Sequence, residues 1–161
     1  LVDKLGDERI NDDKLIEAAT LALCWSRAWS SGGGHGTVFA VKPAQVSKTA
    51  QTGEYVGKGA FIVRGQRQWF RDLDVKFGIG IVAINGVPLL MSGTPDLILS
   101  ICSRYAILSS GITKKDRLAN RIYKNTGIST DEILAVLPGP CDIMEERGIF
   151  TPFVQESSEE E

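Results

Sequence analysis

The residues best equipped for chemistry lie in a polar stretch between positions 42 and 71. This stretch has a net charge of +5 in a chain whose total charge is −2, because Glu54 is its only acidic residue. Its six basic residues are Lys42, Lys48, Lys58, Arg64, Arg67 and Arg71. A basic zone inside a mildly acidic protein indicates an anionic partner.

Several side chains in residues 45–65 have types that suit RNA. Lys48 and Arg64, with nearby backbone N–H groups, are suited to phosphate, and Tyr55 offers a ring face on which a base stacks. Lys58 adds a further positive charge. Glu54 is suited to bonding a base edge or a 2′-hydroxyl group, or to holding Lys48 or Arg64 by an ion pair. We therefore predict an RNA site in this segment.

Residues 66–71 place two aromatic rings among arginines. Arg67 and Arg71 flank Trp69 and Phe70. Aromatic rings beside arginines suit unpaired bases, because stacking contributes about 1–3 kcal/mol per base. The alternative is that both rings cover the end of the core. We assign Trp69 to the RNA site, because surface aromatics among charges are typical of binding surfaces.

A second basic zone lies between residues 104 and 124, which again have a net charge of +5. A helix predicted from Thr113 to about Asn125 would place four cations on one stripe, since helical residues repeat every 3.6 positions. They are Lys114, Arg117, Arg121 and Lys124. Such a stripe is either a solvated face or part of an RNA surface. Two basic zones in one small acidic protein favour nucleic acid.

Enzymatic chemistry is the first alternative. A small hydrolase or transferase would use loop residues 35–54, with His35, Ser47, Lys48 or Glu54 as its reactive groups. No oxyanion-hole signature accompanies them. The glycines at 78 and 80 match the letters of a dinucleotide fingerprint, but a strand continues where pyrophosphate needs a helix. We expect no catalytic residue, no cofactor and no enzymatic activity, and we expect these glycines to permit close packing.

The cysteines give no sign of a metal site. Cys24, Cys102 and Cys141 are far apart, and His35 is the only histidine. A structural zinc site needs about four such ligands. We therefore predict no metal and expect three small buried hydrophobic residues in a reducing compartment. No apolar run is long enough to span a membrane.

The fold that positions these residues is predicted to be α+β. A mixed or antiparallel sheet is packed by a long N-terminal helix and followed by a small β-hairpin and helix subdomain. Asn11 caps the first helix, whose apolar face continues to Trp29 before residues 30–34 end it. Residues 65–74 are expected to form a turn. The other expectations are strands at 37–41, 59–64 and 105–109, a hairpin at 76–91, and helices at 95–103, 113–125 and 130–137.

The chain resembles a known family over roughly residues 10–70. The resemblance rests on Ala28-Trp29, residues 45–50 (QVSKTA), 52–55 (TGEY), Gly59, 61–62, 64–65 and Phe70. These residues resemble the RNA-binding NFACT-R domain of the ribosome-quality-control factors, often labelled fibronectin-binding-protein-like. The chain departs from the family at residues 33–39, where the family has an aromatic-rich strand. The family's histidine-containing first strand would lie before Leu1.

The resemblance implies an RNA-binding module that engages tRNA and the large ribosomal subunit on stalled complexes, in the cytoplasm. Residues 1–74 would be the C-terminal part of the domain, residues 75–150 an α+β extension and residues 151–161 a disordered acidic tail. The family's tail-synthesis activity would need other domains. The second alternative is a protein-interaction module anchored by Trp69 and Phe70. A strand absent before Leu1 would leave an open sheet edge near residues 37–41 or 59–64, so we expect some homodimerisation of the fragment.

Overall fold

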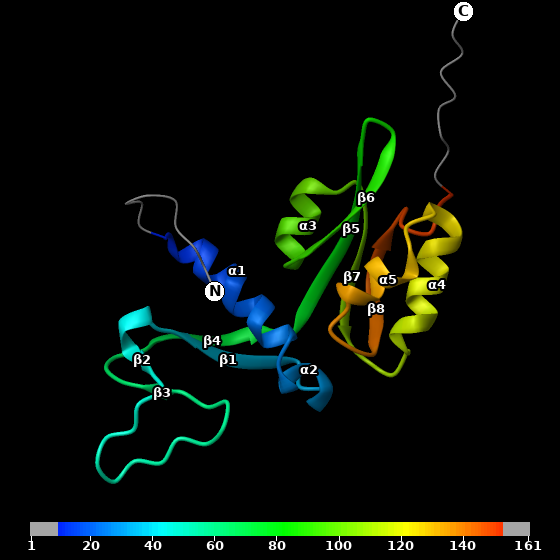
Figure 1. Cartoon of the computed structure of the whole chain (residues 1–161). Coiled ribbons are helices and arrows are strands. Elements are labelled where there is room, and N and C mark those ends of the chain that lie inside the picture. The colour runs from blue at the N-terminus through cyan, green and yellow to red at the C-terminus, as the bar shows by residue number, and fades with distance from the viewer. Residues whose placement is uncertain (1–9, 153–161) are drawn as a thin grey trace, which may run out of the picture.

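The computed structural model describes residues 10–152. The elements are α1 (Asp12–Cys24), α2 (Arg27–Ser31), β1 (His35–Ala40), η1 (Pro43–Gln45), β2 (Val46–Ser47), β3 (Ile62–Val63), β4 (Gln68–Asp74), β5 (Lys76–Ile84), β6 (Val87–Gly93), α3 (Pro95–Ile101), β7 (Arg104–Ser110), α4 (Lys115–Thr126), α5 (Thr130–Ala135) and β8 (Cys141–Arg147). β1 pairs with β4, β2 pairs with β3, and a four-stranded antiparallel sheet has the order β6-β5-β7-β8. Figure 1 shows this arrangement. The predicted α+β class is confirmed.

Both faces of the four-stranded sheet are covered, because successive side chains along each strand point to opposite faces. Phe77, Ile79 and Ile81 of β5 join the main core with α4 and α5. Ile98 and Cys102, at the α3 side, form a second cluster with Tyr105 and Ile107 of β7. Residues of opposite parity on each strand therefore serve opposite faces, as the two-residue period of a strand requires.

α3 lies close to β5 because two strand positions carry no side chain. A Cβ atom at Gly78 would lie 2.7 Å from Cγ1 of Ile98, and one at Gly80 would lie 2.6 Å from Cβ of Cys102. The packing role predicted for these glycines is confirmed. β5 runs unbroken from Lys76 to Ile84, so no helix follows the glycines and the dinucleotide interpretation is excluded.

Replacing Gly80 by alanine is expected to lower the free energy of unfolding by about 1–3 kcal/mol, because the new methyl group overpacks the contact with Cys102. Gly57→Ala is the matched control, since nothing lies within 4 Å of a Cβ there. The control is expected to change stability by less than about 0.5 kcal/mol. Urea denaturation measures both. Equal effects at the two positions would contradict the close packing of α3 on β5.

The prediction of a single N-terminal helix is wrong, because the helix is interrupted at residues 25–26 and the structure has two helices, α1 and α2. α1 ends at Cys24. Ser26 is extended, and its Oγ accepts a hydrogen bond from the N–H of Ala28 at 3.1 Å, so it caps α2. Gly32 has φ of 70° and ends α2, as predicted. After this break, the side chain of Trp29 lies buried in the core.

Residues 65–74 are not a turn, because residues 68–74 form β4. Gln68–Asp74 pairs antiparallel with β1, and two residues, Arg71 and Asp72, face Thr37 in a bulge. Asp72 takes a positive φ of 57° there. The expected strand at 59–64 is only two residues long, Ile62–Val63. The polar segment before it therefore has little regular structure.

The C-terminal half follows the predicted elements except at its end. Asn85 and Gly86 have φ of 52° and 76° and close the β5–β6 hairpin. Thr94 and Ser129 cap α3 and α5. β8, which the sequence analysis missed, pairs with β7 at the sheet edge. Lys114 takes the N-cap position of α4, because the hydroxyl of Thr113 donates to Oδ1 of Asp142 on β8 at 3.0 Å.

The main core crosses the predicted division between residues 74 and 75. Leu23, Cys24 and Trp29 share one cluster with Val75 and Phe77. The division of the chain into domains at residues 74 and 75 stays a prediction. The predicted disorder of the acidic tail falls almost entirely on residues outside the described range. Within residues 10–152, no helix has both the length and the apolar character needed to cross a membrane.

Candidate nucleic-acid interface

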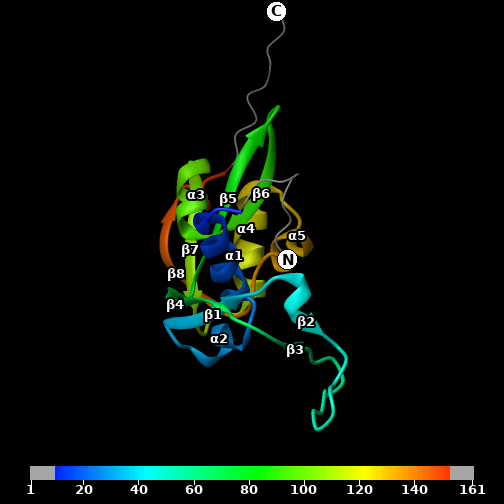
Figure 2. The same ribbon diagram turned by 90° about the vertical axis from the view of Figure 1, so that its left-hand side faces the viewer.

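The segment joining β2 to β3 projects from the body of the protein in both views (Figures 1 and 2). We call residues 46–63 the β2–β3 hairpin. Lys48, Tyr55 and Lys58 are exposed, and Tyr55 is 92% exposed. Nζ of Lys48 lies 5.1 Å from the ring centroid of Phe61. The hairpin thus presents two cations and two aromatic rings to solvent, as the RNA interpretation requires.

Arg64 and Glu54 form an ion pair across the hairpin. Nη2 of Arg64 donates to Oε2 of Glu54 at 2.5 Å, and the same oxygen accepts the N–H of Gln51 at 2.8 Å. Both partners are about one-third exposed, so solvent screens the pair. Of the roles considered for Glu54, the structure contains the ion pair with Arg64. That pair fixes the guanidinium beside the loop.

Gln45, a residue that the sequence analysis gave no role, ties the base of the hairpin together. Its Nε2 donates to the carbonyl oxygens of Arg64 at 2.8 Å and Gln66 at 2.7 Å. Its Oε1 accepts the N–H of Lys42 at 3.0 Å, and its carbonyl accepts the N–H of Arg64 at 2.9 Å. These hydrogen bonds link the residue just before β2 to the residues just after β3, so the two ends of the hairpin are held together. Its place as the first residue of the QVSKTA run in the family pattern is the signal that the sequence offers.

The β1–β4 ribbon carries the other predicted group. Trp69 is half exposed and lies directly opposite Phe39, with ring centroids 5.3 Å apart. The guanidinium carbon of Arg67 lies 4.8 Å from the Phe39 centroid, and that of Arg71 lies 5.3 Å from the Trp69 centroid. Phe70 points the other way and is half-buried. The sequence does not identify Phe39 as a site residue, because its pairing with Trp69 needs β4 where a turn is expected.

The cationic stripe on α4 forms as predicted but lies apart from the hairpin. Lys114, Arg117, Arg121 and Lys124 are exposed, while Leu118, Ala119 and Ile122 on the neighbouring face are buried. A shallow hollow of about 300 Å³ between α4 and β8 includes Arg117 and Arg121 in its lining. Figure 1 places α4 and the β2–β3 hairpin on opposite sides of the molecule. The two basic zones are therefore separate surfaces.

The groups considered for catalysis do not converge. His35 is the first residue of β1, and its Nδ1 lies 3.0 Å from Oδ1 of Asp74 at the end of β4. Ser47 lies past the other end of β1, beyond η1, and its Oγ accepts the N–H of Thr49 at 3.0 Å. Lys48 directs its ammonium group toward Phe61. Ser47 thus stabilises a turn in this loop.

The cysteines are free and buried, as predicted. Burial raises the pKa of Cys24 and of Cys141 to about 11 and raises the pKa of Cys102. At neutral pH the reactive thiolate is therefore disfavoured at all three positions. Within residues 10–152, no group of three or more His, Cys, Asp or Glu side chains is arranged to hold a metal ion.

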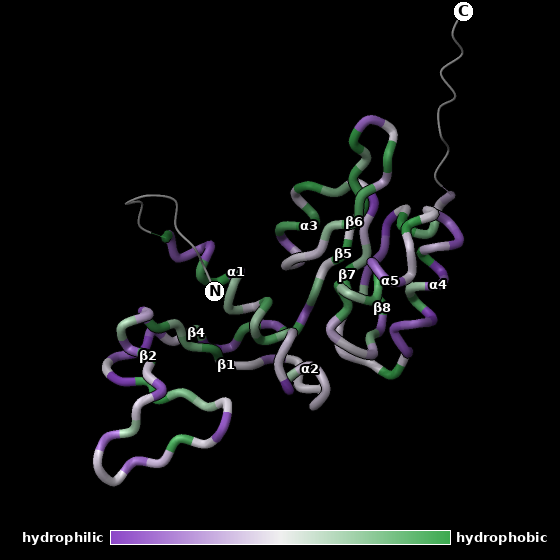
Figure 3. The backbone as a smooth tube through the Cα atoms, viewed as in Figure 1, coloured by the Kyte–Doolittle hydropathy of each residue, from purple (hydrophilic) through white to green (hydrophobic). Residues whose placement is uncertain are grey.

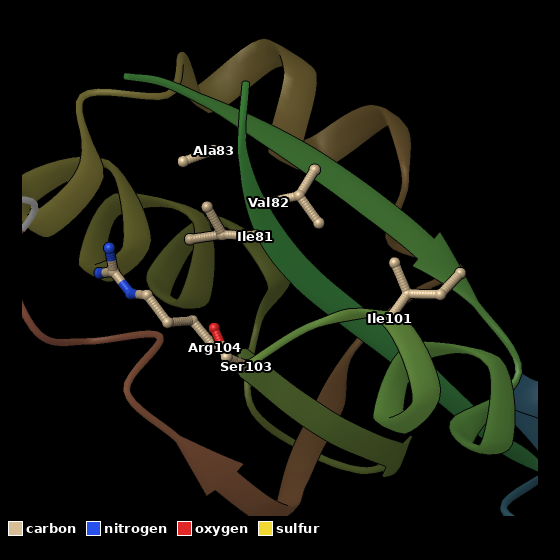
Figure 4. Close-up of a pocket in the computed structure, with 6 residues that line it drawn as sticks. All are labelled: Ile81, Val82, Ala83, Ile101, Ser103 and Arg104. Atoms are coloured by element: carbon tan, nitrogen blue, oxygen red, sulfur yellow. The ribbon is translucent and has the colours of Figure 1, made fainter. Parts of the chain in front are cut away.

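Exposed apolar side chains gather on the β5–β6 hairpin and α3. They are Ile84, Val87, Leu89, Leu99 and Ile101. In Figure 3 much of the tube along this hairpin is green, the colour of hydrophobic residues. A hollow of about 310 Å³ beside it, drawn in Figure 4, is lined by Ile81, Val82, Ala83, Ile101, Ser103 and Arg104. Nε of Arg104 donates to the carbonyl of Gly148 at 2.9 Å, so this side chain is engaged in the fold.

Known proteins match the chain over the same segment that holds the hairpin. Residues 2–65 match the family described as the NFACT protein RNA binding domain. The archaeal Rqc2 homolog aRqcH of Methanocaldococcus jannaschii is 32% identical over 147 residues, which is 89% of this chain and 22% of that protein. The ribosome quality control complex subunit NEMF of Homo sapiens is 44% identical over 62 residues, or 38% of this chain and 6% of that protein.

The matches also set limits. The NEMF homolog of Drosophila melanogaster is 33% identical over 75 residues, covering 47% of this chain and 8% of that protein. The chain thus spans about a fifth of the archaeal relative and less than a tenth of the animal relatives. No solved structure matches significantly. Since the archaeal match covers 89% of the chain, it includes most of the segment after residue 65. The resemblance seen between Ala28 and Phe70 is confirmed, and the chain belongs to the NFACT family.

Proposed function

We propose that this chain is an RNA-binding module of a ribosome-quality-control factor. The observation that carries the proposal is the coincidence of the NFACT RNA binding domain match, residues 2–65, with the projecting β2–β3 hairpin. Lys48, Lys58 and the exposed ring of Tyr55 lie on that hairpin. Cations bind phosphate, and an exposed ring stacks on a base.

The proposal also names the RNA partners of the chain and its location in the cell. Relatives named for ribosome quality control support a role in the cytoplasm on stalled ribosomes, with tRNA and the large subunit as RNA partners. Because the hairpin and α4 lie on opposite sides of the molecule, they would contact two different RNA segments. The chain would act by binding and would carry no catalytic site of its own, and tail synthesis would belong to other domains.

The test is binding of tRNA at several salt concentrations, measured by fluorescence anisotropy, with duplex DNA of similar length as the comparison. We expect tight binding at low salt, and the logarithm of the association constant should fall linearly with the logarithm of salt concentration, by about 0.9 per phosphate contact on a duplex. Absence of binding at low salt, or affinity that does not change with salt, would contradict the proposed function.

A protein contact is the second candidate function. The apolar surface on the β5–β6 hairpin and α3 favours it. This surface lies on different elements from Trp69 and Phe70, which the sequence analysis had named as anchors. Homodimerisation through an edge near residues 37–41 or 59–64 stays a prediction. Sedimentation of the chain at rising concentration tests this prediction, and a chain that stays monomeric would contradict it.

A further inference from the structure

We propose that the outer face of the β1–β4 ribbon binds unpaired bases of a single-stranded RNA segment. Phe39 and Trp69 form the stacking platform, and Arg67 and Arg71 flank it. The proposal rests on the proposed RNA-binding function and adds the class of RNA that this surface takes. It also assigns a role to Phe39, which the sequence pattern alone does not identify as a site residue.

The ribbon separates its side chains into two sets. Phe39 and Trp69 are direct cross-strand partners, and their rings meet edge to face with an interplanar angle of 63°. Val38 and Leu73 contact the main core on the other side. Arg67 and Arg71 both lie against the exposed Trp69 ring, so they share its face, and the bulge at residues 71–72 returns Leu73 to the core side. The outer face is therefore an aromatic pair with a guanidinium on each side.

These rings stay accessible although they are large. Trp69 is 46% exposed and Phe39 is 39% exposed. The arginines pack against them, with Arg67 4.8 Å from the Phe39 centroid and 6.0 Å from the Trp69 centroid, and Arg71 5.3 Å from the Trp69 centroid. Such cation–π contacts limit ring motion and hold the platform in one arrangement. A guanidinium also offers a flat face to a base and N–H donors to phosphate.

The chemistry of this surface selects unpaired RNA. A ring stacks on a base only where the face of that base is free, and a duplex buries those faces between neighbouring pairs. A-form RNA also has a deep, narrow major groove that side chains do not read. A platform of two rings thus distinguishes a single strand from a duplex, whereas lysines on the β2–β3 hairpin bind phosphates of either.

The charges around the ribbon indicate the direction of the RNA strand. Asp72 and Asp74 lie at the end of β4 farthest from the hairpin, where they face His35 at 3.7 Å and 3.0 Å, and Lys76 lies 3.6 Å from Asp74. At the other end, Gln45 holds the hairpin base beside Arg67. A strand that stacks on Trp69 therefore continues toward Arg64 and Lys48, away from the carboxylates.

The experiment compares a labelled ten-nucleotide single-stranded RNA with an RNA duplex of the same length and with an abasic version of the single strand. In the protein carrying Phe39→Leu and Trp69→Leu, we expect affinity for the single strand to fall by about 5- to 150-fold, the range that loss of one stacked base gives. Affinity for the duplex and for the abasic strand should stay nearly unchanged. Trp25→Leu, at an exposed tryptophan on another element, is the matched control and should bind as the wild type does.

A second measurement uses the wild-type protein, so it does not depend on whether the Phe39→Leu, Trp69→Leu variant folds. Stacking of a base on Trp69 should quench the tryptophan fluorescence of the wild-type protein, and the abasic strand should not. Single-strand affinity equal in wild type and in the folded double variant, or equal losses for single strand and duplex, would overturn the inference. If either of these results is found while tRNA binding is salt-dependent, the inference fails but the proposed function stands. Absence of all RNA binding at low salt would overturn both.

Discussion

Trp29→Ala is expected to lower the free energy of unfolding by about 3–5 kcal/mol. The indole is 3% exposed and lies in the main core. Its Nε1 donates to the carbonyl oxygen of Pro140 at 2.8 Å, so α2 is fixed to the chain segment that leads into β8. Alanine would leave a cavity and remove the indole hydrogen bond, so that the Pro140 carbonyl keeps the N–H of Gly111 as a donor at 3.2 Å. The lost packing and the lost hydrogen bond act in the same direction.

Trp25→Ala provides the comparison for this prediction. Trp25 is 53% exposed and meets Phe77 edge to face with centroids 6.3 Å apart. Its loss is expected to cost about 0.5–1.5 kcal/mol, the contribution of such an aromatic pair. Urea denaturation of both variants measures the difference. A Trp29→Ala variant no less stable than Trp25→Ala would show that the contact between α2 and residues 138–140 does not hold the fold together.

Sequence predicted the elements whose signals are local. Asn85-Gly86 supplies both positive-φ positions of the β5–β6 turn within two residues, and Gly127 ends α4 in the left-handed conformation. Thr94-Pro95 and Ser129 carry their capping signals in the same way. These signals act through neighbouring residues, so no knowledge of the tertiary structure was needed to find them.

β4 and β8 were missed because partners distant in sequence make them strands. β4 is rich in charged and polar residues, and it is extended because it pairs with β1, about thirty positions earlier. β8 buries only Cys141 at its start, so it lacks the apolar alternation that marks a strand. Charged residues on an edge strand discourage pairing with other chains, which explains its composition. The helix break at Ser26 was hidden by apolar spacing that continues across it.

The candidate site was predicted by residue type more fully than by geometry. Charge and aromatic content identified Lys48, Tyr55, Lys58 and Trp69. The contacts of Gln45 could not be derived, because its partners Arg64 and Gln66 lie about twenty residues away. The partnership of Phe39 with Trp69 depends on the β1–β4 register in the same way. Long-range pairing, which composition does not encode, decides which of the predicted side chains act together.

Removing the three cations of the hairpin zone, with Lys48→Ala, Lys58→Ala and Arg64→Ala combined, is expected to weaken tRNA binding by more than about 100-fold. Each lost phosphate contact removes a hydrogen bond to a charged group, worth about 1.5–3 kcal/mol. The salt slope should also fall, by about 0.9 for each contact made to duplex phosphates. Anisotropy titrations at several salt concentrations measure both quantities. None of the three side chains belongs to a core cluster, so the melting temperature should change little.

The matched control removes the same formal charge from α4, with Arg117→Ala, Arg121→Ala and Lys124→Ala combined. Both triple variants alter the long-range field by three charges, so the excess loss in either one reports direct contact at that zone. We expect the larger loss in the hairpin variant, because the hairpin lies inside the matched residues 2–65 and α4 lies outside them. A large drop in melting temperature with unchanged tRNA affinity would instead make Lys48, Lys58 and Arg64 structural residues. A larger loss in the α4 variant would move the main RNA contact to the other side of the molecule.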